Sequence, residues 1–159
     1  MIDRHLFPSL RALPAIAGLS VLVLAVWMAR AADVQFAPAI TVVMDGEPLR
    51  VEVADTLPRR KRGLQGRAAL ADGRGMLFVY PQPRAIRLWM KDTLINLDVA
   101  FFDGRGHWLA SAQMRAGELR IHASPDTARF ALELPAGWLR AHGVGPGSRL
   151  RAPGYTESQ

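Results

Sequence analysis

Short apolar runs recur along the chain from residue 39 onward, and several of them alternate with polar residues. In the run 49–53, every second side chain is apolar and the residues between are charged, which is the period-two pattern of a half-buried strand. The apolar run 40–44 precedes it, and Asp45-Gly46 between the two is a strong hairpin signal. The two runs are therefore expected to form an antiparallel pair.

Further runs have the length and composition of strands, and turn residues separate them. They are 75–80, 85–91, 97–102, 107–114, 127–134 and 148–151. Two short helices are predicted as well, at 57–64 after a capping Thr56 and at 136–142 before Gly143. Short strands without regular crossover helices indicate a mainly β fold, either a single antiparallel β-sandwich of jelly-roll-like form or a partly open barrel.

The first 31 residues have a different pattern. Residues 12–29 carry no charge, Arg4 and Arg11 precede them, and an A-x-A site follows at 29–31. These are the features of a secretory signal peptide. An uncleaved membrane anchor is the alternative, because the uncharged stretch approaches the roughly 20 residues that span a bilayer. Both interpretations predict a periplasmic domain, and the second anchors it in the inner membrane.

Four parts of the chain follow from these patterns. Residues 1–31 are predicted to be the signal peptide or anchor, 32–38 a linker, 39–152 the β domain and 153–159 a disordered tail. One domain of this size can bury a core of its own without disulfide or metal.

Composition narrows the chemistry that this domain can perform. The 159 residues include no cysteine, which excludes disulfides, cysteine-ligated metals and thiol catalysis. The net charge is +6, an excess too modest to predict a nucleic-acid partner. His107, His122 and His142 are spread over different predicted elements, without the spacing of a metal site. We therefore expect no metal and no cofactor.

Five blocks of sequence stand out, in the order VEVADT (51–56), RGLQGR (62–67), GMLFVY (75–80), WMKDTLINLDVAFFD (89–103) and ALELPAGW (131–138). In this order they resemble domain-of-unknown-function family 192, whose central block usually reads Trp-Met-Lys-Asn-Thr and then Ile-Pro-Leu-Asp. Asp92 and Asn96 depart from that pattern, and Asp92 places a charge where the family has a neutral amide. The resemblance implies a compact β-sandwich or jelly-roll-like fold, often in exported or membrane-tethered chains, and no established activity.

The central block also holds the candidate binding site. In a strand, Trp89, Lys91 and Thr93 share one face, and Met90 and Asp92 share the other. An aromatic ring, a cation and a hydroxyl on one face can bind a sugar or an anionic small molecule in a cleft.

Asp98 and Lys91 support two other interpretations. A hairpin between 85–91 and 97–102 would bring them together, and an ion pair there would fix the register of the turn. In a hydrolase of envelope carbohydrate, Asp98 would instead act as acid or base and Lys91 as electrostatic stabiliser. Asp103, which precedes Gly104, is expected to form a turn.

The basic run 59–62 on the first predicted helix is expected to face solvent, with an anionic membrane surface as the alternative partner. Phe78, Phe101, Phe102 and Trp108 are expected in the core.

The sequence as a whole favours a small exported module that binds an envelope ligand or a protein partner. A hydrolase that uses Asp98 and Lys91, and a structural subunit of an envelope complex, are the alternatives. The sequence leaves open whether the protein is an enzyme. Binding is favoured over catalysis because no common catalytic motif occurs.

Overall fold

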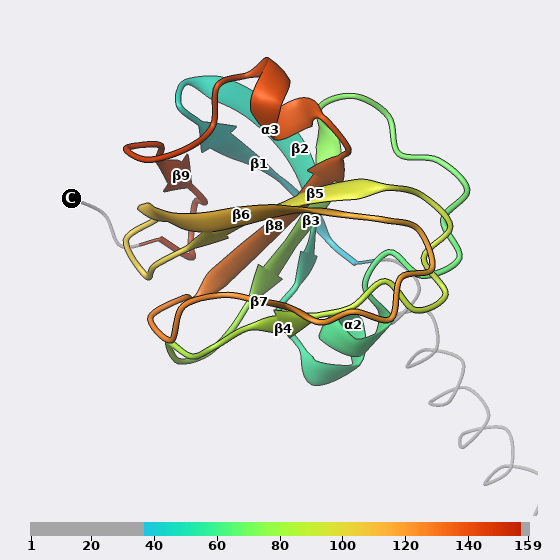
Figure 1. Cartoon of the computed structure of the whole chain (residues 1–159). Helices are drawn as coiled ribbons and strands as arrows, with labels where there is room; N and C mark the ends of the chain where they lie inside the picture. Colours follow the sequence, from blue (N-terminus) through green and yellow to red (C-terminus); the bar gives the residue numbers. More distant parts are fainter. Residues whose placement is uncertain (1–36, 157–159) are drawn as a thin grey trace, which may run out of the picture. The chain divides into compact units, whose positions relative to one another are not determined.

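The structure, a computed structural model, describes residues 37–156 (Figure 1). The predicted signal peptide or anchor and the last residues of the predicted tail lie outside this range, and the predicted domain boundaries stay predictions. Within residues 37–156, no helix has both the length and the apolar composition that crossing a membrane requires.

Seven strands form one sheet, in the order β6-β5-β8-β3-β2-β1-β9. The predicted hairpin is confirmed, because β1 and β2 pair antiparallel around Asp45-Gly46, with Val42 opposite Leu49. The bounds are β1 Ala39–Met44, β2 Glu47–Ala54, β3 Arg74–Val79, β5 Leu97–Phe102, β6 Trp108–Met114, β8 Phe130–Pro135 and β9 Leu150–Arg151.

One pair in this sheet is parallel. Strands β2 and β3 run in the same direction, with Arg50 opposite Arg74, whereas every other pair in the sheet is antiparallel. A parallel pair needs a crossover, and α2 (Leu57–Arg62) lies within the connection that provides it. The helix begins as predicted, since the Thr56 hydroxyl accepts a hydrogen bond from the Arg59 backbone N–H at 3.4 Å.

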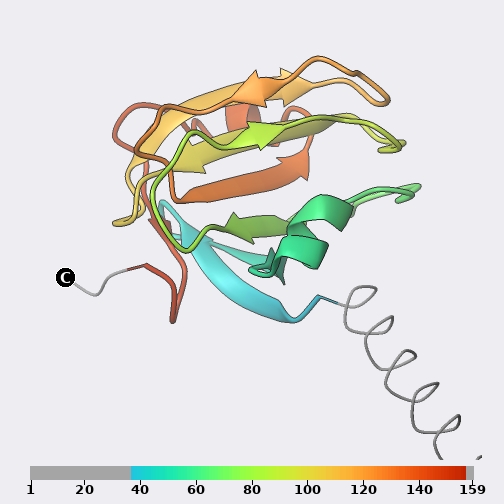
Figure 2. The ribbon, with the colours of Figure 1, turned by 90° about the horizontal axis from the view of Figure 1, so that it is seen from below.

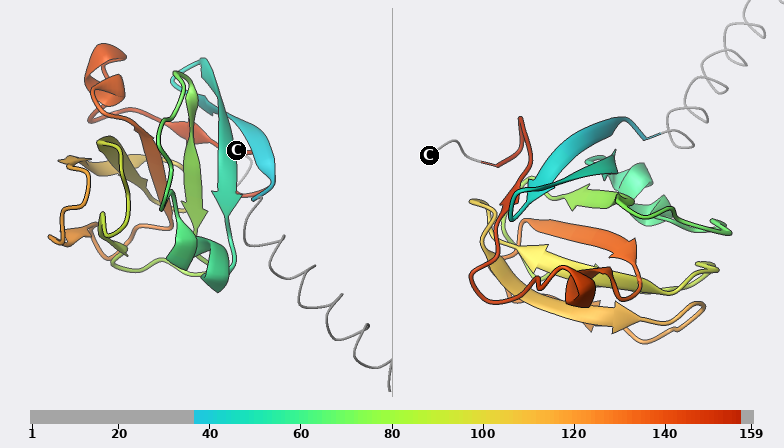
Figure 3. Two further views of the ribbon diagram at one scale, coloured as in Figure 1. Left: turned by 90° about the vertical axis from the view of Figure 1, so that its right-hand side faces the viewer. Right: turned by 90° about the horizontal axis from the view of Figure 1, so that it is seen from above.

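The sheet curls until its two edge strands meet at one end. The Trp108 N–H donates to the Ser148 carbonyl at 3.0 Å, and the Leu150 N–H donates to the Gly106 carbonyl at 2.8 Å. Gly106 has a φ of +82°, and a Cβ at this position would overlap the Leu150 carbonyl oxygen. The mainly β prediction is confirmed, and of the two predicted architectures the curled sheet matches the partly open barrel (Figure 3).

A second layer lies over the outer face of the curled sheet (Figure 2). It is a ribbon of two short strands, β4 (Arg87–Leu88) and β7 (His122–Ala123), which pair antiparallel with Leu88 opposite His122. The expected hairpin between 85–91 and 97–102 is therefore wrong. Ile86, Leu88 and Met90 are buried against the outer face of the sheet, so their segment packs on β5 instead of extending the sheet beside it.

Two apolar clusters hold these layers together. One fills the inside of the curl and includes Val42, Leu77, Phe102 and Phe130. The other lies between the sheet and the β4–β7 ribbon and contains the following buried side chains: Met76, Phe78, Ile86, Met90, Val99 and Phe101. Strand β5 contributes to both clusters and is buried along its whole length, which explains its nearly unbroken apolar sequence. The core prediction for Phe78, Phe101 and Phe102 is confirmed, and Trp108 is partly buried.

Helix α3 (Trp138–Ala141) follows β8 and lies near the predicted position. The Trp138 ring stacks on the His142 ring at a centroid distance of 3.8 Å, and His142 ends the helix. The helix packs against β5 and β8. In this position it contacts Asp98 of β5, one of the predicted site residues.

Candidate functional site

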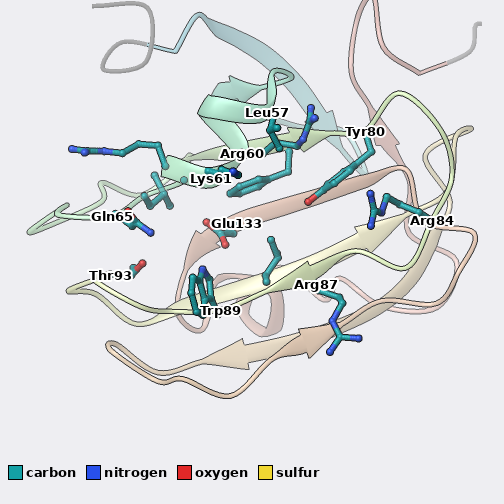
Figure 4. A pocket seen from close by; sticks show the side chains of 15 residues that line it. Leu57, Arg60, Lys61, Gln65, Tyr80, Arg84, Arg87, Trp89, Thr93 and Glu133 are labelled. Atoms are coloured by element: carbon teal, nitrogen blue, oxygen red, sulfur yellow. The ribbon is translucent and has the colours of Figure 1, made fainter. Parts of the chain in front are cut away.

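A pocket of about 470 Å³ opens between α2 and the β4 segment, with β3 and β8 behind it (Figure 4). Its walls come from four parts of the chain that are distant in sequence: helix α2 and the turn after it, the end of β3, the β4 segment and β8. The pocket therefore lies on the outer face of the sheet, at the boundary between the sheet and the layer that covers it.

Glu133 on β8 points its carboxyl group into this pocket (Figure 4). The strand register places Met76 on one side of it and Val99 on the other, both buried and apolar. Glu133 is 4 % exposed, and its carboxyl forms no hydrogen bond or ion pair within residues 37–156. Burial raises its pKa from 4.5 to about 8. The side chain is therefore mostly protonated at neutral pH and can donate a hydrogen bond.

Arg60 is fixed over the pocket by backbone oxygens. Its Nη1 donates to the carbonyl oxygens of Val79, at 2.9 Å, and of Asp55. The guanidinium carbon lies 4.9 Å from the centre of the Tyr80 ring, and the Arg84 guanidinium lies 5.7 Å from the same ring. Burial raises the pKa of the Tyr80 hydroxyl, although the two arginines oppose that shift. Tyr80 is therefore neutral, and it contributes an aromatic ring and a hydroxyl group to the wall of the pocket.

Cationic side chains dominate the electrostatics of the pocket. Five of them line it: Arg60, Lys61, Arg62, Arg84 and Arg87. Lys61, Arg62 and Arg87 are exposed and form no ion pair within residues 37–156. Glu133 is the one carboxylic acid among the lining residues, and at neutral pH it is mostly uncharged. The pocket therefore carries a positive field that attracts anions.

The basic run 59–62 thus has two roles instead of one. Arg59 pairs with Asp55 at 3.1 Å, and Arg60 turns inward over Tyr80. Only Lys61 and Arg62 at its end are exposed as the solvated-face prediction requires. That prediction is wrong for Arg60, because backbone oxygens at the ends of β2 and β3 attract its guanidinium.

The structure brings two of the predicted site residues into this pocket. Trp89 is 52 % exposed and forms part of the wall, and Thr93 is buried beside it. Lys91 lies outside the lining, with its Nζ 5.7 Å from the centre of the Trp89 ring. Met90 is a core residue of the outer cluster. The strand ends at Leu88. The predicted alternation of side chains between two faces therefore does not extend over the central block, and it holds only for Met90.

Asp92 occupies a position that sets the shape of the loop. Its φ is +58°, a left-handed conformation that asparagine and aspartate adopt more readily than other non-glycine residues. Its carbonyl accepts a hydrogen bond from the Gly66 N–H at 2.8 Å, which ties this loop to the turn after α2. Asparagine and aspartate both suit the backbone here, so the departure at this position leaves the loop intact.

Asp98 lies on the opposite face of the sheet from Glu133. It is paired in register with Leu134, whereas Glu133 is paired with Val99, and paired residues share a face. The Asp98 carboxylate accepts hydrogen bonds from the Leu139 N–H at 3.1 Å and the Gln113 amide at 3.4 Å. The expected ion pair between Asp98 and Lys91 is not found within residues 37–156. It cannot form through a hairpin, since their segments belong to different layers.

Each of the three histidines in the described chain has a local partner. His107 contacts the Asp103 carboxylate at 3.0 Å, His122 contacts the Glu118 carboxylate at 3.3 Å, and His142 stacks on Trp138. Within residues 37–156, no three metal-ligating side chains gather at one point. Asp103 forms the expected turn, because its carboxylate accepts from the Arg105 and His107 N–H groups.

Glu133 and Tyr80 were missed by the sequence analysis. Glu133 is the one charged residue in the strand FALELP, where all other residues up to Leu134 are buried and apolar. A lone acid in a doubly buried strand was a usable signal, because a charge is expensive there unless it serves a site. Tyr80 could not be assigned from its neighbours in sequence, since its environment comes from α2 and Arg84.

Comparison with known proteins gives the family and the fold. The model of domain-of-unknown-function family 192, described as "Uncharacterized ACR, COG1430", matches residues 40–152. No curated protein matches the chain. A crystal structure from Sinorhizobium meliloti 1021, named a "putative transcription regulator", is 30 % identical with a TM-score of 0.71, and the match covers 73 % of this chain and 95 % of that one.

A second solved structure has the same fold. It is a protein of unknown function from Novosphingobium aromaticivorans DSM 12444, with 24 % identity and a TM-score of 0.70 over 73 % of this chain and 86 % of that one. The family model spans the curled sheet except its first residue, Ala39, as well as helices α2 and α3 and every lining residue of the pocket. The chain belongs to domain-of-unknown-function family 192.

Proposed function

We propose that the domain is a binding module whose pocket holds a small anionic ligand with a ring or another flat apolar face. The observation that carries the proposal is Glu133, a buried carboxyl group that points into a basic pocket and has no partner in the described chain. A buried polar group without a partner costs free energy, and a ligand that accepts its hydrogen bond would remove that cost.

The lining residues of the pocket supply different interactions with such a ligand. Arg60 is already fixed by backbone oxygens, so it can bind an anionic oxygen without losing further side-chain freedom. The protonated Glu133 donates to a neutral or anionic oxygen of the ligand, and Thr93 offers a hydroxyl beside it. Trp89 supplies an exposed ring for the flat face. A sugar acid or a sugar phosphate combines these features.

The hydrolase alternative has less support. Acid–base hydrolysis of glycosides needs two carboxyl groups at one site, and Glu133 is the one carboxylic acid among the lining residues. Asp98 faces the inside of the curl and is bound to α3, and Lys91 lies in a different layer. The structural-subunit alternative would leave the basic pocket without a role.

The name of the Sinorhizobium meliloti protein raises nucleic acid as a partner. The cations of this chain argue for a smaller ligand, because those at the site line a concave pocket with Trp89 and Tyr80 instead of extending along a flat or helical surface. A phosphate group is common to both ligands, so a short oligonucleotide belongs in the test.

Binding can be measured by calorimetry with glucuronate, glucose 6-phosphate, glucose, inorganic phosphate and a short oligonucleotide as probes. We expect one of the two sugar anions to bind, with neutral glucose at least tenfold weaker because the arginines then have no partner. Binding of the oligonucleotide alone would overturn the small-ligand proposal. Failure of every probe, with the protein folded, would contradict an anionic pocket ligand.

Variants locate the bound probe. Trp89→Ala and Arg87→Ala should each weaken binding several-fold, because both side chains are exposed on the pocket wall. Arg151→Ala is the matched control, since it removes an equal charge from an exposed position outside the pocket. An equal loss in the control would show that only the net charge matters.

We also propose that the domain is exported to the cell envelope. The support is in the sequence, in the uncharged stretch 12–29 and the A-x-A site at 29–31, both outside the described residues. A fusion of alkaline phosphatase after Gln159 should be active, because that reporter needs the periplasm. An inactive phosphatase fusion together with a fluorescent cytoplasmic one would contradict export.

A further inference from the structure

Four large apolar side chains are exposed at one end of the β4–β7 ribbon, and together we call them the apolar tip. They are Trp89, 52 % exposed, Leu94, 64 %, Leu119, 70 %, and Ile121, 47 %. Only one other large apolar side chain within residues 37–156, Leu57, is exposed to this degree, and it belongs to the pocket already described. Loop ends are usually polar, so this concentration needs an explanation.

The fold brings the four residues together from two loops. The Met90 N–H donates to the Glu118 carbonyl at 3.1 Å, and the Gly117 N–H donates to the Thr93 carbonyl at 3.0 Å. Leu94 and Leu119 line the same shallow depression. The ribbon pairs Leu88 with His122, and Trp89 and Ile121 are their neighbours in sequence on the side of the two loops. The four residues of the apolar tip therefore come from two loops that are joined by backbone hydrogen bonds, and two of them share one depression.

Basic side chains accompany the apolar tip in the same two loops. Lys91, Arg115 and Arg120 are exposed in these two loops, and Arg87 lies at the start of the ribbon. The acids nearby are fewer, namely Asp92 and Glu118. The Glu118 carboxylate is in contact with the His122 ring at 3.3 Å. Apolar side chains with a tryptophan, bordered by cations, match the two layers of a membrane interface, the acyl chains and the anionic head groups.

We propose that the apolar tip docks the domain on a membrane that contains anionic lipids. Leu94 and Leu119 enter the acyl boundary, Trp89 lies at the level of the head groups, and Lys91, Arg115 and Arg120 contact the lipid phosphates. The docking surface shares Trp89 with the ligand pocket, but neither leucine lines that pocket, so positions 94 and 119 test docking alone. A failure of docking at these two positions would leave the proposed ligand binding untouched.

The absence of cysteine makes a site-specific test possible in the full chain. Leu94→Cys and Leu119→Cys, each labelled with the fluorophore NBD, report the polarity around one position at a time. With vesicles of phosphatidylcholine and phosphatidylglycerol we expect a blue shift and a several-fold rise in emission at both positions. Vesicles of phosphatidylcholine alone, or high salt, should reduce the change because they remove or screen the anionic charge.

Gln82→Cys is the control, since this exposed residue lies in the turn at the other end of β4. Its label should remain in water even if another part of the chain holds the protein to the vesicle. No shift at positions 94 and 119, or an equal shift at position 82, would overturn the proposal. Protection of positions 94 and 119 by a protein in cell extract, without any change in vesicles, would assign the apolar tip to a protein partner and likewise overturn it.

Discussion

The Asp98 carboxylate accepts a hydrogen bond from the Leu139 backbone N–H, 3.1 Å away, and so joins β5 to the first turn of α3. Both residues are buried, and the Asp98 carboxylate also receives the Gln113 amide. The aspartate of the central motif is thus part of the connection between sheet and helix, on the inside of the curl.

Asp98→Ala should therefore destabilise the domain by about 1–3 kcal/mol, because it leaves the buried Leu139 N–H without an acceptor. Asp98→Asn should cost less, since its amide oxygen can still accept that hydrogen bond. The free energy of unfolding in urea measures both changes. Ligand binding should survive in each folded variant, and a loss of binding with unchanged stability would return Asp98 to the functional site.

Glu133 gives the stability of the domain a defined pH dependence. Its folded-state pKa of about 8 exceeds the ordinary value of 4.5, so the folded state holds a proton that the unfolded state releases between these values. The contribution of this group is therefore favourable at low pH and is lost as the pH rises from about 4.5 to 8, by a few kcal/mol in total. Glu133→Gln should remove this part of the dependence. Unfolding curves at pH 5 and pH 8 measure it, and parallel pH profiles for the two proteins would disprove the assignment.

Ionisation of Glu133 should also affect the proposed ligand. Above pH 8 the carboxylate can no longer donate and repels an anion, so affinity for the anionic probe should fall. Calorimetry at pH 6.5 and pH 9 tests this, and Glu133→Gln, whose amide still donates, should bind almost equally at both pH values. The same fall in the variant would trace the effect to another group.

Arg60→Ala should cost about 1–3 kcal/mol of stability, because two backbone carbonyl oxygens lose a charged donor and Tyr80 loses the cation over its ring. Arg62→Ala, in the same helix but exposed and without an ion pair in the described chain, should change stability by less than about 0.5 kcal/mol. Thermal and urea unfolding of the two variants give the comparison. Equal effects would mean that Arg60 acts only through its charge.

The closure of the barrel can be tested with two neighbouring glycines. Gly106→Ala should destabilise strongly, by more than about 2 kcal/mol, because φ is +82° and the new Cβ would overlap the Leu150 carbonyl oxygen. Gly104→Ala, in the same turn, meets only an ordinary contact with Arg129 and should be nearly neutral. The difference in melting temperature measures the contribution of the closure, and two equally mild changes would show that the edges need not meet.

Much of the fold was predictable, because local pattern determines it. The β1–β2 hairpin follows from Asp45-Gly46, and α2 begins where Thr56 can cap it. The parallel pairing of β2 with β3 was not predictable from alternation, which specifies a face but not a neighbour or a direction. The β4–β7 ribbon was hidden for the same reason, since Ile86, Leu88 and Met90 alternate equally well in a strand of the main sheet and in a layer above it.

The candidate site was predictable only in part. Trp89 and Thr93 are where an unusual motif suggested, whereas Lys91 and Asp98 were assigned to each other by a hairpin that does not form. Glu133, Arg60 and Tyr80 come from three elements that are distant in sequence and meet only through the crossover of α2. Their chemistry is a property of the packed layers.

The contact between the two edge strands also determines when the domain can complete its folding during synthesis. Gly106 and Trp108 bind residues 148 and 150, and the turn residue Asp45 accepts a hydrogen bond from the Arg149 N–H at 2.7 Å. Residues 148–150, at the end of the domain, therefore form hydrogen bonds with residues at its beginning and in its middle. Contacts between residues so distant in sequence slow folding. A chain that leaves the ribosome from its N-terminus cannot complete this barrel until its final strand has emerged. Until then the nascent chain lacks the contacts of residues 148–150 that close the curled sheet.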